Sequence, residues 1–509
     1  MNKVIQILLF SAIGFFIGFF CLGGLLPFIQ SYSFFISFIG ILISFIYIFN
    51  SKNYKNIISY TIFLSIGSFF GIDFVIPDAL SKFLNISTEY SYFIGFIVGI
   101  FKLYFIYLLI LMKYFCIDNE NFISNRLNKL SLDVKIVLYS ITITFVQILT
   151  EYVFPGQVGY ILNEHVEYLN LLPIVGLSGY TYLLTFVFIG LSLIIKERKI
   201  SCFYILFIIC SLVINFTLQI DYNLNYNKKE SLNVRIIQYP FLELKQFDTF
   251  PDKFIKEEFS PIIEESKNVD LILFPEASFP YVYKDYKDFS NLLFIKNAIK
   301  NKANVQLSLF KEMNNKIYNV SILVKKNRLP SFYYKEQLFP VGETSPLFLN
   351  LLINKDKKED MNTKENKERL FKIKEFSYLP LLCFENFNPN LFRKSNKIWS
   401  FVTIQSNESW VFNSNMRKYL LNFSKIRAKE FNTYIYKSDT SGPSSIINNK
   451  GETIVNIINN KEFFDYSSPK KISNKFEYYY KYREFVLLLI VIFQLSLILV
   501  VELIRIKDK

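Results

Sequence analysis

The chain has 509 residues, of which 51% are hydrophobic and 18% aromatic, and its mean hydropathy is +0.26. This composition is too apolar for an ordinary water-soluble protein of this size, so a lipid bilayer is expected to surround part of the chain. The formal net charge is +14, but the basic residues are spread along the chain and enriched beside apolar stretches. That distribution argues against nucleic-acid binding and indicates membrane orientation signals.

Eight apolar stretches are long enough to cross about 30 Å of hydrocarbon. Seven precede residue 222, at about 4–22, 33–50, 57–76, 91–115, 136–154, 172–195 and 201–220, and the eighth is 484–504. We therefore predict a seven-span bundle over residues 1–221 and a C-terminal span with a short tail over 483–509. The first stretch is too long for a cleaved signal peptide, and no small-x-small cleavage site follows it. We therefore expect it to be a permanent span. Lys102, inside the fourth stretch, is expected to reach a carboxylate within the bundle.

Basic residues between the stretches predict the orientation. If the N-terminus is cytoplasmic, the short outer loops carry only Lys82. The basic residues on the inner side are then Lys3, Lys52, Lys55, Lys113, Arg126, Lys129, Lys135, Lys196, Arg198, Lys199, Arg505, Lys507 and Lys509. Positive charge favours the cytoplasmic side, so the polar region 222–482 is expected outside the cytoplasmic membrane, in the periplasm of a bacterium, with both termini cytoplasmic.

The region 222–482 alternates β-rich and helical patterns. Strands are expected at 233–240, 269–277, 303–310, 317–325, 378–385, 399–408, 433–440 and 443–449, and amphipathic helices at 250–267 and 416–431. This alternation predicts an α/β domain with two packed sheets. The charge-dense, aliphatic-poor segment 353–375 is expected to be a mobile, solvated insertion.

One thiol, one amine and one carboxylate in this region form a candidate acyl-transfer site. Cys383 is the only cysteine of the region, and it follows Glu276 in FPEASFP and Lys335 in YYKEQLFPVGE. A thiol attacks a carbonyl carbon well only as the thiolate, so it needs a base, for which Glu276 is the candidate. The Lys335 ammonium would supply a positive field and stabilise the oxyanion of a tetrahedral intermediate.

Cysteine and histidine counts exclude other chemistry. The five cysteines are Cys21, Cys116, Cys202, Cys210 and Cys383, an odd number without regular spacing, so no disulfide framework is predicted. His165 is the only histidine, which excludes a histidine metal cluster and a Ser–His–Asp triad in the polar region. No metal and no other cofactor is expected.

The three blocks FPEAS, YYKEQLFPVGE and LLCFE resemble those of the nitrilase superfamily. Together with the flanking spans, they make the chain similar to the apolipoprotein N-acyltransferases, the membrane-embedded branch of that superfamily. The family pattern around the lysine, roughly Y-x-K-x-x-L-V-P-F-G-E, is matched at Tyr333, Lys335, Leu338, Pro340, Gly342 and Glu343. The resemblance implies a multi-span helical membrane bundle joined to an extracytoplasmic αββα sandwich.

Site roles follow from the resemblance position by position. It implies that Glu276 is the general base, Lys335 the oxyanion-supporting lysine and Cys383 the nucleophile. Its other implied positions are Glu343 and Glu385 as supporting residues, and Phe384, Asn407 and Trp410 as substrate-binding residues. The chain departs from the family where Phe384 replaces a usual tyrosine, Glu408 replaces a usual aspartate, and MRKYL stands in place of a stretch that commonly contains histidine.

The implied reaction is a two-step acyl transfer. Cys383 takes an acyl chain from a membrane phospholipid, and the thioester then acylates the α-amino group of the N-terminal diacylglyceryl-cysteine of an apolipoprotein. A monomer in the bacterial inner membrane, with no nucleic-acid partner, is expected. The alternatives are a membrane-tethered nitrilase-type amidase that hydrolyses a small amide, and a receptor or transporter whose outer domain only binds ligand.

Overall fold

A computed structural model describes the following residues: 3–19, 33–70, 81, 87–102, 104–118, 127, 129–150, 157–218, 226–239, 268–284, 303–326, 328–339, 343–344, 361–394, 399–409, 414–458, 462–471 and 477–507. The chain divides into two compact units. One comprises Met1–Ile220 and Tyr478–Lys509, and the other comprises Asp221–Glu477.

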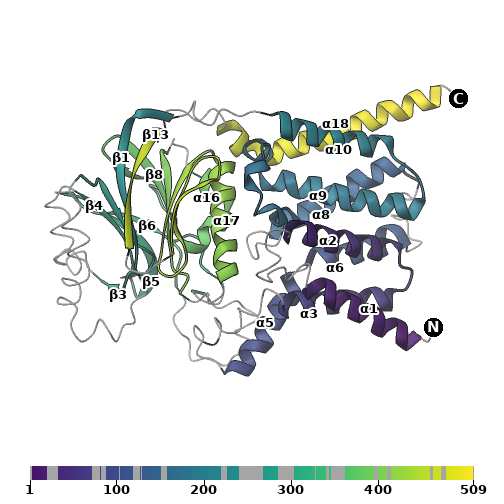
Figure 1. The fold of residues 1–509 in the computed structure, drawn as a ribbon, viewed down its shortest axis with the longest axis horizontal. Helices are drawn as coiled ribbons and strands as arrows, with labels where there is room; N and C mark the ends of the chain where they lie inside the picture. The colour runs from purple at the N-terminus through teal and green to yellow at the C-terminus, as the bar shows by residue number, and fades with distance from the viewer. Residues whose placement is uncertain are drawn as a thin grey trace. The chain divides into compact units, whose positions relative to one another are not determined.

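The first unit is helical (Figure 1). Its main α-helices are α1 (Lys3–Ile17), α2 (Ser33–Asn50), α3 (Tyr54–Ser68), α5 (Thr88–Lys102), α6 (Tyr104–Lys113), α8 (Leu132–Thr150), α9 (Leu172–Glu197), α10 (Cys202–Thr217) and α18 (Glu477–Lys507). Each of the eight predicted apolar stretches overlaps at least one of these helices. By length and composition, the described part of α8 and the whole of α9 are candidate membrane spans, and four shorter apolar helices accompany them.

Helix α9 forms much of the core of this unit. Its side chains pack against α2 and α8, and Phe186, Phe188 and Ile189 are fully or almost fully buried. The helix bends at Gly176, whose φ of 64° lies in the left-handed region that favours glycine. The part of the helix beyond Gly176, residues 177–197, is about 32 Å long, since each residue adds about 1.5 Å.

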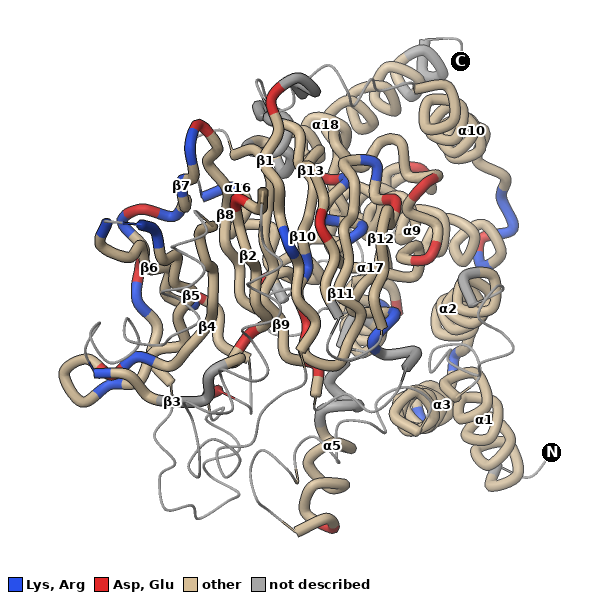
Figure 2. Tube along the Cα trace, turned by 60° about the vertical axis from the view of Figure 1, so that its left-hand side comes forward, with Lys and Arg blue, Asp and Glu red and all other residues tan. Residues whose placement is uncertain are grey.

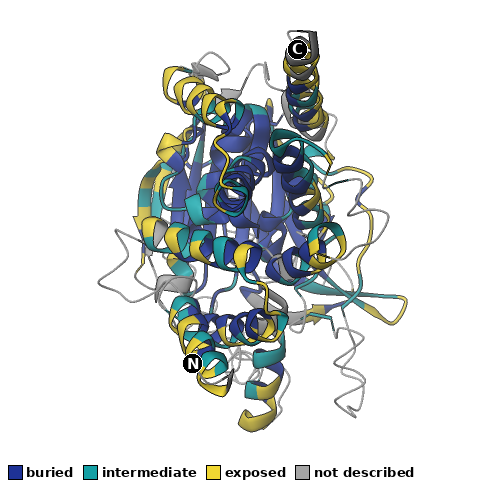
Figure 3. Ribbon diagram, turned by 90° about the vertical axis from the view of Figure 1, so that its right-hand side faces the viewer, coloured by how far each residue is buried: buried dark blue, intermediate teal, exposed yellow. Residues whose placement is uncertain are grey.

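Apolar side chains also cover the outer surface of this unit. Helix α10 carries no charged residue, and basic residues cluster just before it (Figure 2). Leu206, Val213 and Phe216 on this helix are more than half exposed, and exposed residues recur along the other helices of the unit (Figure 3). Water would not favour so much exposed apolar surface, whereas hydrocarbon would.

The second unit contains two mixed β-sheets. Among the described residues, the first sheet has the order β13-β1-β2-β4-β5-β6, with β3 paired to β4, and the second has the order β12-β11-β10-β9-β8-β7. Strands of the first sheet are β1 (Tyr226–Gln238), β2 (Leu271–Leu273), β3 (Phe279–Tyr283), β4 (Asn304–Met313), β5 (Lys316–Val324), β6 (Ser331–Tyr334) and β13 (Glu462–Lys471). Strands of the second are β7 (Phe371–Ile373), β8 (Phe376–Leu382), β9 (Phe401–Ser406), β10 (Tyr434–Asp439), β11 (Ser444–Ile447) and β12 (Thr453–Ile457).

The two sheets pack face to face, and helix α17 (Ser414–Glu430) lies against the second sheet (Figure 1). Side chains of β2, β4 and β5 point into the core with almost no exposed surface, as in Ile272, Val305 and Ile322. The α/β class predicted from the sequence is confirmed. The predicted helix at 250–267 lies outside the described residues.

Candidate active site

Glu276, Lys335 and Cys383 each follow a strand. Glu276 comes three residues after β2, Lys335 directly follows β6, and Cys383 directly follows β8. Strands β1, β2 and β4 run parallel to one another, and so do β8, β9 and β10. The carboxyl ends of parallel strands collect at one edge of a sheet, where side chains for chemistry commonly gather.

Glu276 and Lys335 form a buried ion pair at this edge. Lys335 Nζ lies 2.9 Å from Glu276 Oε1 and 2.7 Å from Glu343 Oε2. Lys335 is 1% exposed and Glu276 is 5% exposed, so water screens these charges weakly. The structure thus brings the predicted base, lysine and supporting Glu343 into direct contact.

Asn319 on β5 joins the two carboxylates from another side. Its Nδ2 donates hydrogen bonds to Glu276 Oε1 at 2.9 Å and to Glu343 Oε1 at 2.6 Å. The Asn319 backbone carbonyl also accepts from the Lys335 backbone N–H at 2.9 Å. Asn319 was not among the predicted site residues, although an amide in the largely apolar run IYNVSILV was a usable signal, because a buried polar group requires partners.

The charges of this cluster do not cancel, since two carboxylates face one ammonium. Burial on its own would lower the pKa of the Lys335 ammonium, but attraction to Glu276 and Glu343 outweighs burial and raises that pKa. The pKa of Glu276 is also raised, by burial and by the charge of Glu343, against the opposing effect of Lys335. A carboxylate with a raised pKa is a stronger base, which suits Glu276 to accept a proton.

Cys383 occupies a sharp turn between β8 and a short 3-10 helix, Cys383–Phe387. Its φ is 44°, which is rare outside glycine, and the residue keeps part of its surface exposed. Buried Arg427 of α17 fixes the end of this turn by donating from Nη2 to the Phe387 carbonyl at 2.9 Å. Strained strand-to-helix turns of this kind present a nucleophile to substrate.

Donors from the end of β9 reach the Cys383 sulfur. The Ser406 hydroxyl lies 3.7 Å from Sγ, and the backbone N–H of Asn407 donates a hydrogen bond to it. Burial and the charge of Glu276 raise the pKa of the thiol, while the Lys335 ammonium and these donors act in the opposite direction. The resting thiol therefore carries its proton, and attack requires a base.

Glu385 connects the Cys383 turn to the segment after Lys335. Its Oε2 accepts from the Leu382 backbone N–H at 2.9 Å, and its Oε1 accepts from the Glu336 N–H at 2.7 Å and the Tyr333 hydroxyl at 3.1 Å. Burial, opposed by these donors, raises the pKa of Glu385 to about 7. Through these hydrogen bonds, Glu385 holds the Cys383 turn against the segment that contains Tyr333 and Glu336.

The three predicted substrate-binding residues have different surroundings. Phe384 is buried, and its ring packs edge-on against Phe339 with a centroid separation of 5.4 Å. The Asn407 side chain accepts from the Ser409 N–H of its own loop at 3.1 Å and from the hydroxyl of Thr440, which directly follows β10, at 2.8 Å. Trp410 lies outside the described residues.

The expectation that 353–375 is a mobile insertion is wrong for its described part, 361–375. Asn366 pairs with both backbone groups of Tyr334, and Arg369 forms an ion pair with Glu336. Residues Phe371–Ile373 form strand β7. The lysine and glutamate content suggested solvation, but Asn366 binds the backbone of Tyr334 and Arg369 binds the carboxylate of Glu336, the two residues that flank Lys335.

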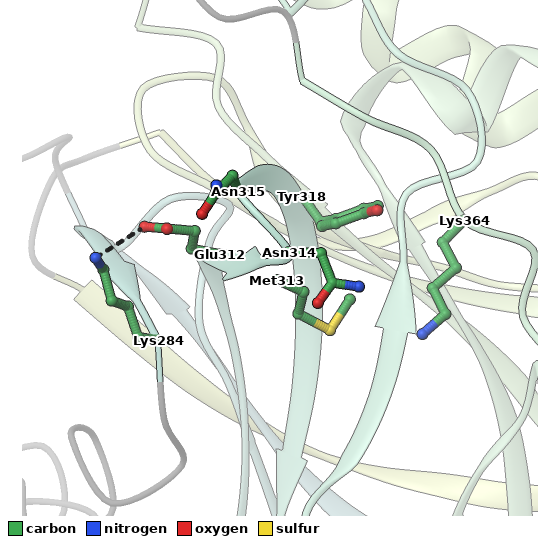
Figure 4. A pocket seen from close by; sticks show the side chains of 7 residues that line it. All are labelled: Lys284, Glu312, Met313, Asn314, Asn315, Tyr318 and Lys364. Carbon is green, nitrogen blue, oxygen red and sulfur yellow. Dashed lines mark ion pairs between the residues drawn. The ribbon is translucent and has the colours of Figure 1, made fainter.

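A polar surface pocket of about 660 Å³ lies at the β4–β5 hairpin (Figure 4). Lys284, Glu312 and Tyr318 line it, and none of the three predicted catalytic residues does. In the parts of the chain that the structure describes, no group of three or more His, Cys, Asp or Glu side chains is arranged to hold a metal ion.

No family model matches the chain. It is 26% identical over 291 residues to the apolipoprotein N-acyltransferase of Aquifex aeolicus (strain VF5), which covers 55% of this chain and 63% of that protein. It is 22% identical over 317 residues to the protein of the same name from Coxiella burnetii, covering 60% and 63%. The chain is a distant relative of the apolipoprotein N-acyltransferases. The resemblance drawn from the sequence blocks is thereby confirmed, although the chain matches less than two thirds of the length of these relatives.

Solved structures cover about half of this chain. One is a protein of branch 10 of the nitrilase superfamily from Saccharomyces cerevisiae, with 16% identity, a TM-score of 0.37, and coverage of 48% of this chain and 92% of that one. Another is a carbon–nitrogen hydrolase from Helicobacter pylori G27, with 11% identity, a TM-score of 0.36, and coverage of 47% and 89%.

Proposed function

We propose that this chain is a phospholipid:apolipoprotein N-acyltransferase. The observation that carries the proposal is the buried Glu276–Lys335 pair at the strand ends, whose charges act on a strained, partly exposed Cys383. A binding domain of a receptor or transporter has no use for such a base, ammonium and thiol. The names of the sequence relatives point to an apolipoprotein as acyl acceptor. The family resemblance of the sequence blocks implies a phospholipid as acyl donor and the diacylglyceryl-cysteine of the apolipoprotein as the acceptor group.

In the first step, Cys383 Sγ attacks the carbonyl carbon of a phospholipid ester while its proton passes to Glu276. The Lys335 ammonium stabilises the oxyanion, the C–O bond breaks, and the lysophospholipid oxygen leaves with the proton from Glu276. In the second step, the α-amino nitrogen of the acceptor attacks the thioester. Glu276 takes the amine proton, the C–S bond breaks, and the thiolate of Cys383 recovers a proton.

The membrane location belongs to the same proposal. Both substrates carry acyl chains, so an enzyme that uses them has to work at a bilayer surface. Eight apolar stretches, overlapped by helices with exposed apolar side chains such as Leu206 and Phe493, suit eight spans in a bacterial inner membrane. The distribution of basic residues supports placing the catalytic domain, residues 222–482, in the periplasm and both termini in the cytoplasm.

The test is detection of the acyl-enzyme. Purified protein in micelles of phospholipid with a labelled acyl chain is treated with neutral hydroxylamine, which cleaves thioesters. We expect release of labelled acyl from wild type, none from Cys383→Ser, and wild-type release from Cys202→Ser, which replaces an exposed cysteine on α10. An unlabelled wild-type protein would contradict the proposal, and ammonia release from small amides without an acyl adduct would favour the amidase.

The acceptor is tested by mass spectrometry of a lipoprotein from cells with and without this gene. A third acyl chain, on the N-terminal amine, is expected only when the gene encodes Cys383. Lipoproteins that carry the same acyl chains in both strains would refute the proposed acceptor while leaving the thioester result intact.

A further inference from the structure

A second buried cluster of charges lies beside the nucleophile, one residue beyond Asn407. Lys437 on β10 places its Nζ 2.5 Å from Glu408 Oε1 and 2.9 Å from Asp439 Oδ2. All three residues are at most 2% exposed. Here too, two carboxylates face one ammonium, so the cluster carries one surplus negative charge if both are ionised. A buried surplus charge is costly, and uptake of one proton removes the cost.

The surroundings of Asp439 stabilise its ionised form more than those of Glu408 do. Besides Lys437, its Oδ1 accepts from three backbone N–H groups, those of Gly442 at 2.7 Å, Ser441 at 3.1 Å and Glu408 at 3.3 Å. Oε2 of Glu408 and Oδ2 of Asp439 are both buried and accept no hydrogen bond among the described residues, so the backbone donors to Oδ1 of Asp439 are what separates the two carboxylates. The proton therefore belongs on Glu408, from which it can be donated to Asp439.

Gly442 shows how closely the two carboxyl groups converge. A Cβ added to this glycine would lie 1.8 Å from Glu408 Oε2 and 3.1 Å from Asp439 Cγ. The electrostatics agree with the geometry. Burial and the charge of Asp439 raise the pKa of Glu408 to about 8, whereas Lys437 and the backbone donors lower that of Asp439 in spite of its burial. Asp439 and Lys437 are the charged groups that act on Glu408.

The cluster is linked to Cys383 through the backbone of β9. Ser406 is paired with Asp439 in the parallel ladder of β9 and β10. Ser406 and Asn407, which directly precede Glu408, supply the hydroxyl and the N–H that reach the Cys383 sulfur. Any shift of Glu408 away from Asp439 therefore moves the segment that carries both donors.

We propose that Glu408 and Asp439 share one proton over the Lys437 ammonium, and that this acid pair is a positioning element that holds the Ser406 and Asn407 donors on the sulfur of Cys383. Loss of the shared proton leaves two carboxylates in repulsion and releases the end of β9. The donors then stabilise the thiolate less. The proposal rests on the nucleophilic role given to Cys383 above and adds Glu408, Lys437 and Asp439 as residues that act through it.

The test measures the rate of alkylation of Cys383 by iodoacetamide at pH 6.5 and pH 9.5 in the full-length protein, followed by mass spectrometry of the peptide that contains Cys383. Glu408→Gln mimics the protonated acid at every pH. We expect its rate to match that of wild type at pH 6.5 and to exceed it about tenfold at pH 9.5, the effect of one hydrogen bond to a charged group. Asp465→Asn, a carboxylate of β13 paired with Arg235, is the control and is expected to follow wild type.

A ratio of Glu408→Gln to wild type that is the same at both pH values would overturn the proposal, since a purely structural role predicts no such pH dependence. If Glu408→Gln does not fold, Asp439→Asn provides the second measurement. That variant leaves one carboxylate for Lys437, so its Cys383 is expected to be alkylated about tenfold faster at pH 9.5 than that of wild type or of Asp465→Asn. Persistence of the wild-type profile in Asp439→Asn would also overturn it. Alkylation needs neither phospholipid nor lipoprotein, so its result is independent of whether acyl transfer is found.

Discussion

Asn319 offers the sharpest test of how the candidate active site is organised. Its amide donates to Glu276 at 2.9 Å and to Glu343 at 2.6 Å, and it contacts no other carboxylate among the described residues. Asn319→Ala removes both bonds. A hydrogen bond to a charged group contributes about 1.5–3 kcal/mol, so the two together contribute at least about 3 kcal/mol. If that energy holds Glu276 in position, formation of the acyl-enzyme slows about a hundredfold.

The assay is the rate of formation of the hydroxylamine-labile adduct in phospholipid micelles, with thermal unfolding measured in parallel. Ser321→Ala is the matched control, because Ser321 is equally buried two residues along β5 but bonds Gln306 and Gln405 instead of a carboxylate. We expect the control to lose about 1 kcal/mol of stability and to keep its rate. A folded Asn319→Ala protein whose rate stays within about threefold of wild type would refute the reasoning.

Three further predictions concern the charges of the site. Lys335→Met leaves two buried carboxylates without a cation, so it should lower the free energy of unfolding by roughly 3–5 kcal/mol, and adding Glu276→Gln should restore part of the loss in a denaturation experiment. Glu276→Gln alone should speed alkylation of Cys383, because the charge that raises the thiol pKa is gone, yet abolish acyl transfer; slower alkylation would contradict this. The raised pKa of Glu385, about 7, means that its folded form keeps a proton that the unfolded form loses near pH 4.5. The contribution of Glu385 to the free energy of unfolding is therefore full below pH 4.5 and falls by about 3 kcal/mol as the pH rises to 7. The stability of Glu385→Gln relative to wild type, measured by denaturation, should rise across this range.

Much of the fold could be predicted because long elements carry periodic patterns. The apolar stretches coincide with helices, and long strands such as β4 and β5 lie where alternating runs were found. Strand β7 was not predicted, because it lies in the charge-rich segment 353–375, which was interpreted as solvated. β13 was missed for another reason: its sequence EFFDYSSPKK is polar and contains Pro469, and only pairing with β1 makes it a strand.

The reactive groups of the site could be predicted from the sequence, but the residues that hold them in position by hydrogen bonds could not. Glu276, Lys335 and Cys383 stand out because charged or nucleophilic residues end apolar runs. Asn319 donates to two carboxylates and Ser406 reaches the Cys383 sulfur from within strands, where the sequence resembles an ordinary core with a polar residue. The same difficulty applies to Asn366, which lies in a charge-rich segment and pairs with the backbone of Tyr334, the last residue of β6. Such roles depend on contacts between residues distant in sequence, which one sequence does not encode locally.

Under the proposed mechanism, the surplus negative charge of the site has a use. In the resting enzyme, Lys335 is held by Glu276 and Glu343, and the thiol of Cys383 keeps its proton because a third negative charge would be costly. When the proton moves to Glu276 during attack, that carboxylate becomes neutral and its hold on the ammonium weakens. The oxyanion appears at the same moment, so the total charge of the site is unchanged and Lys335 gains a new partner. Stabilisation of this kind acts on the transition state and not on the resting thiol, which is what catalysis requires.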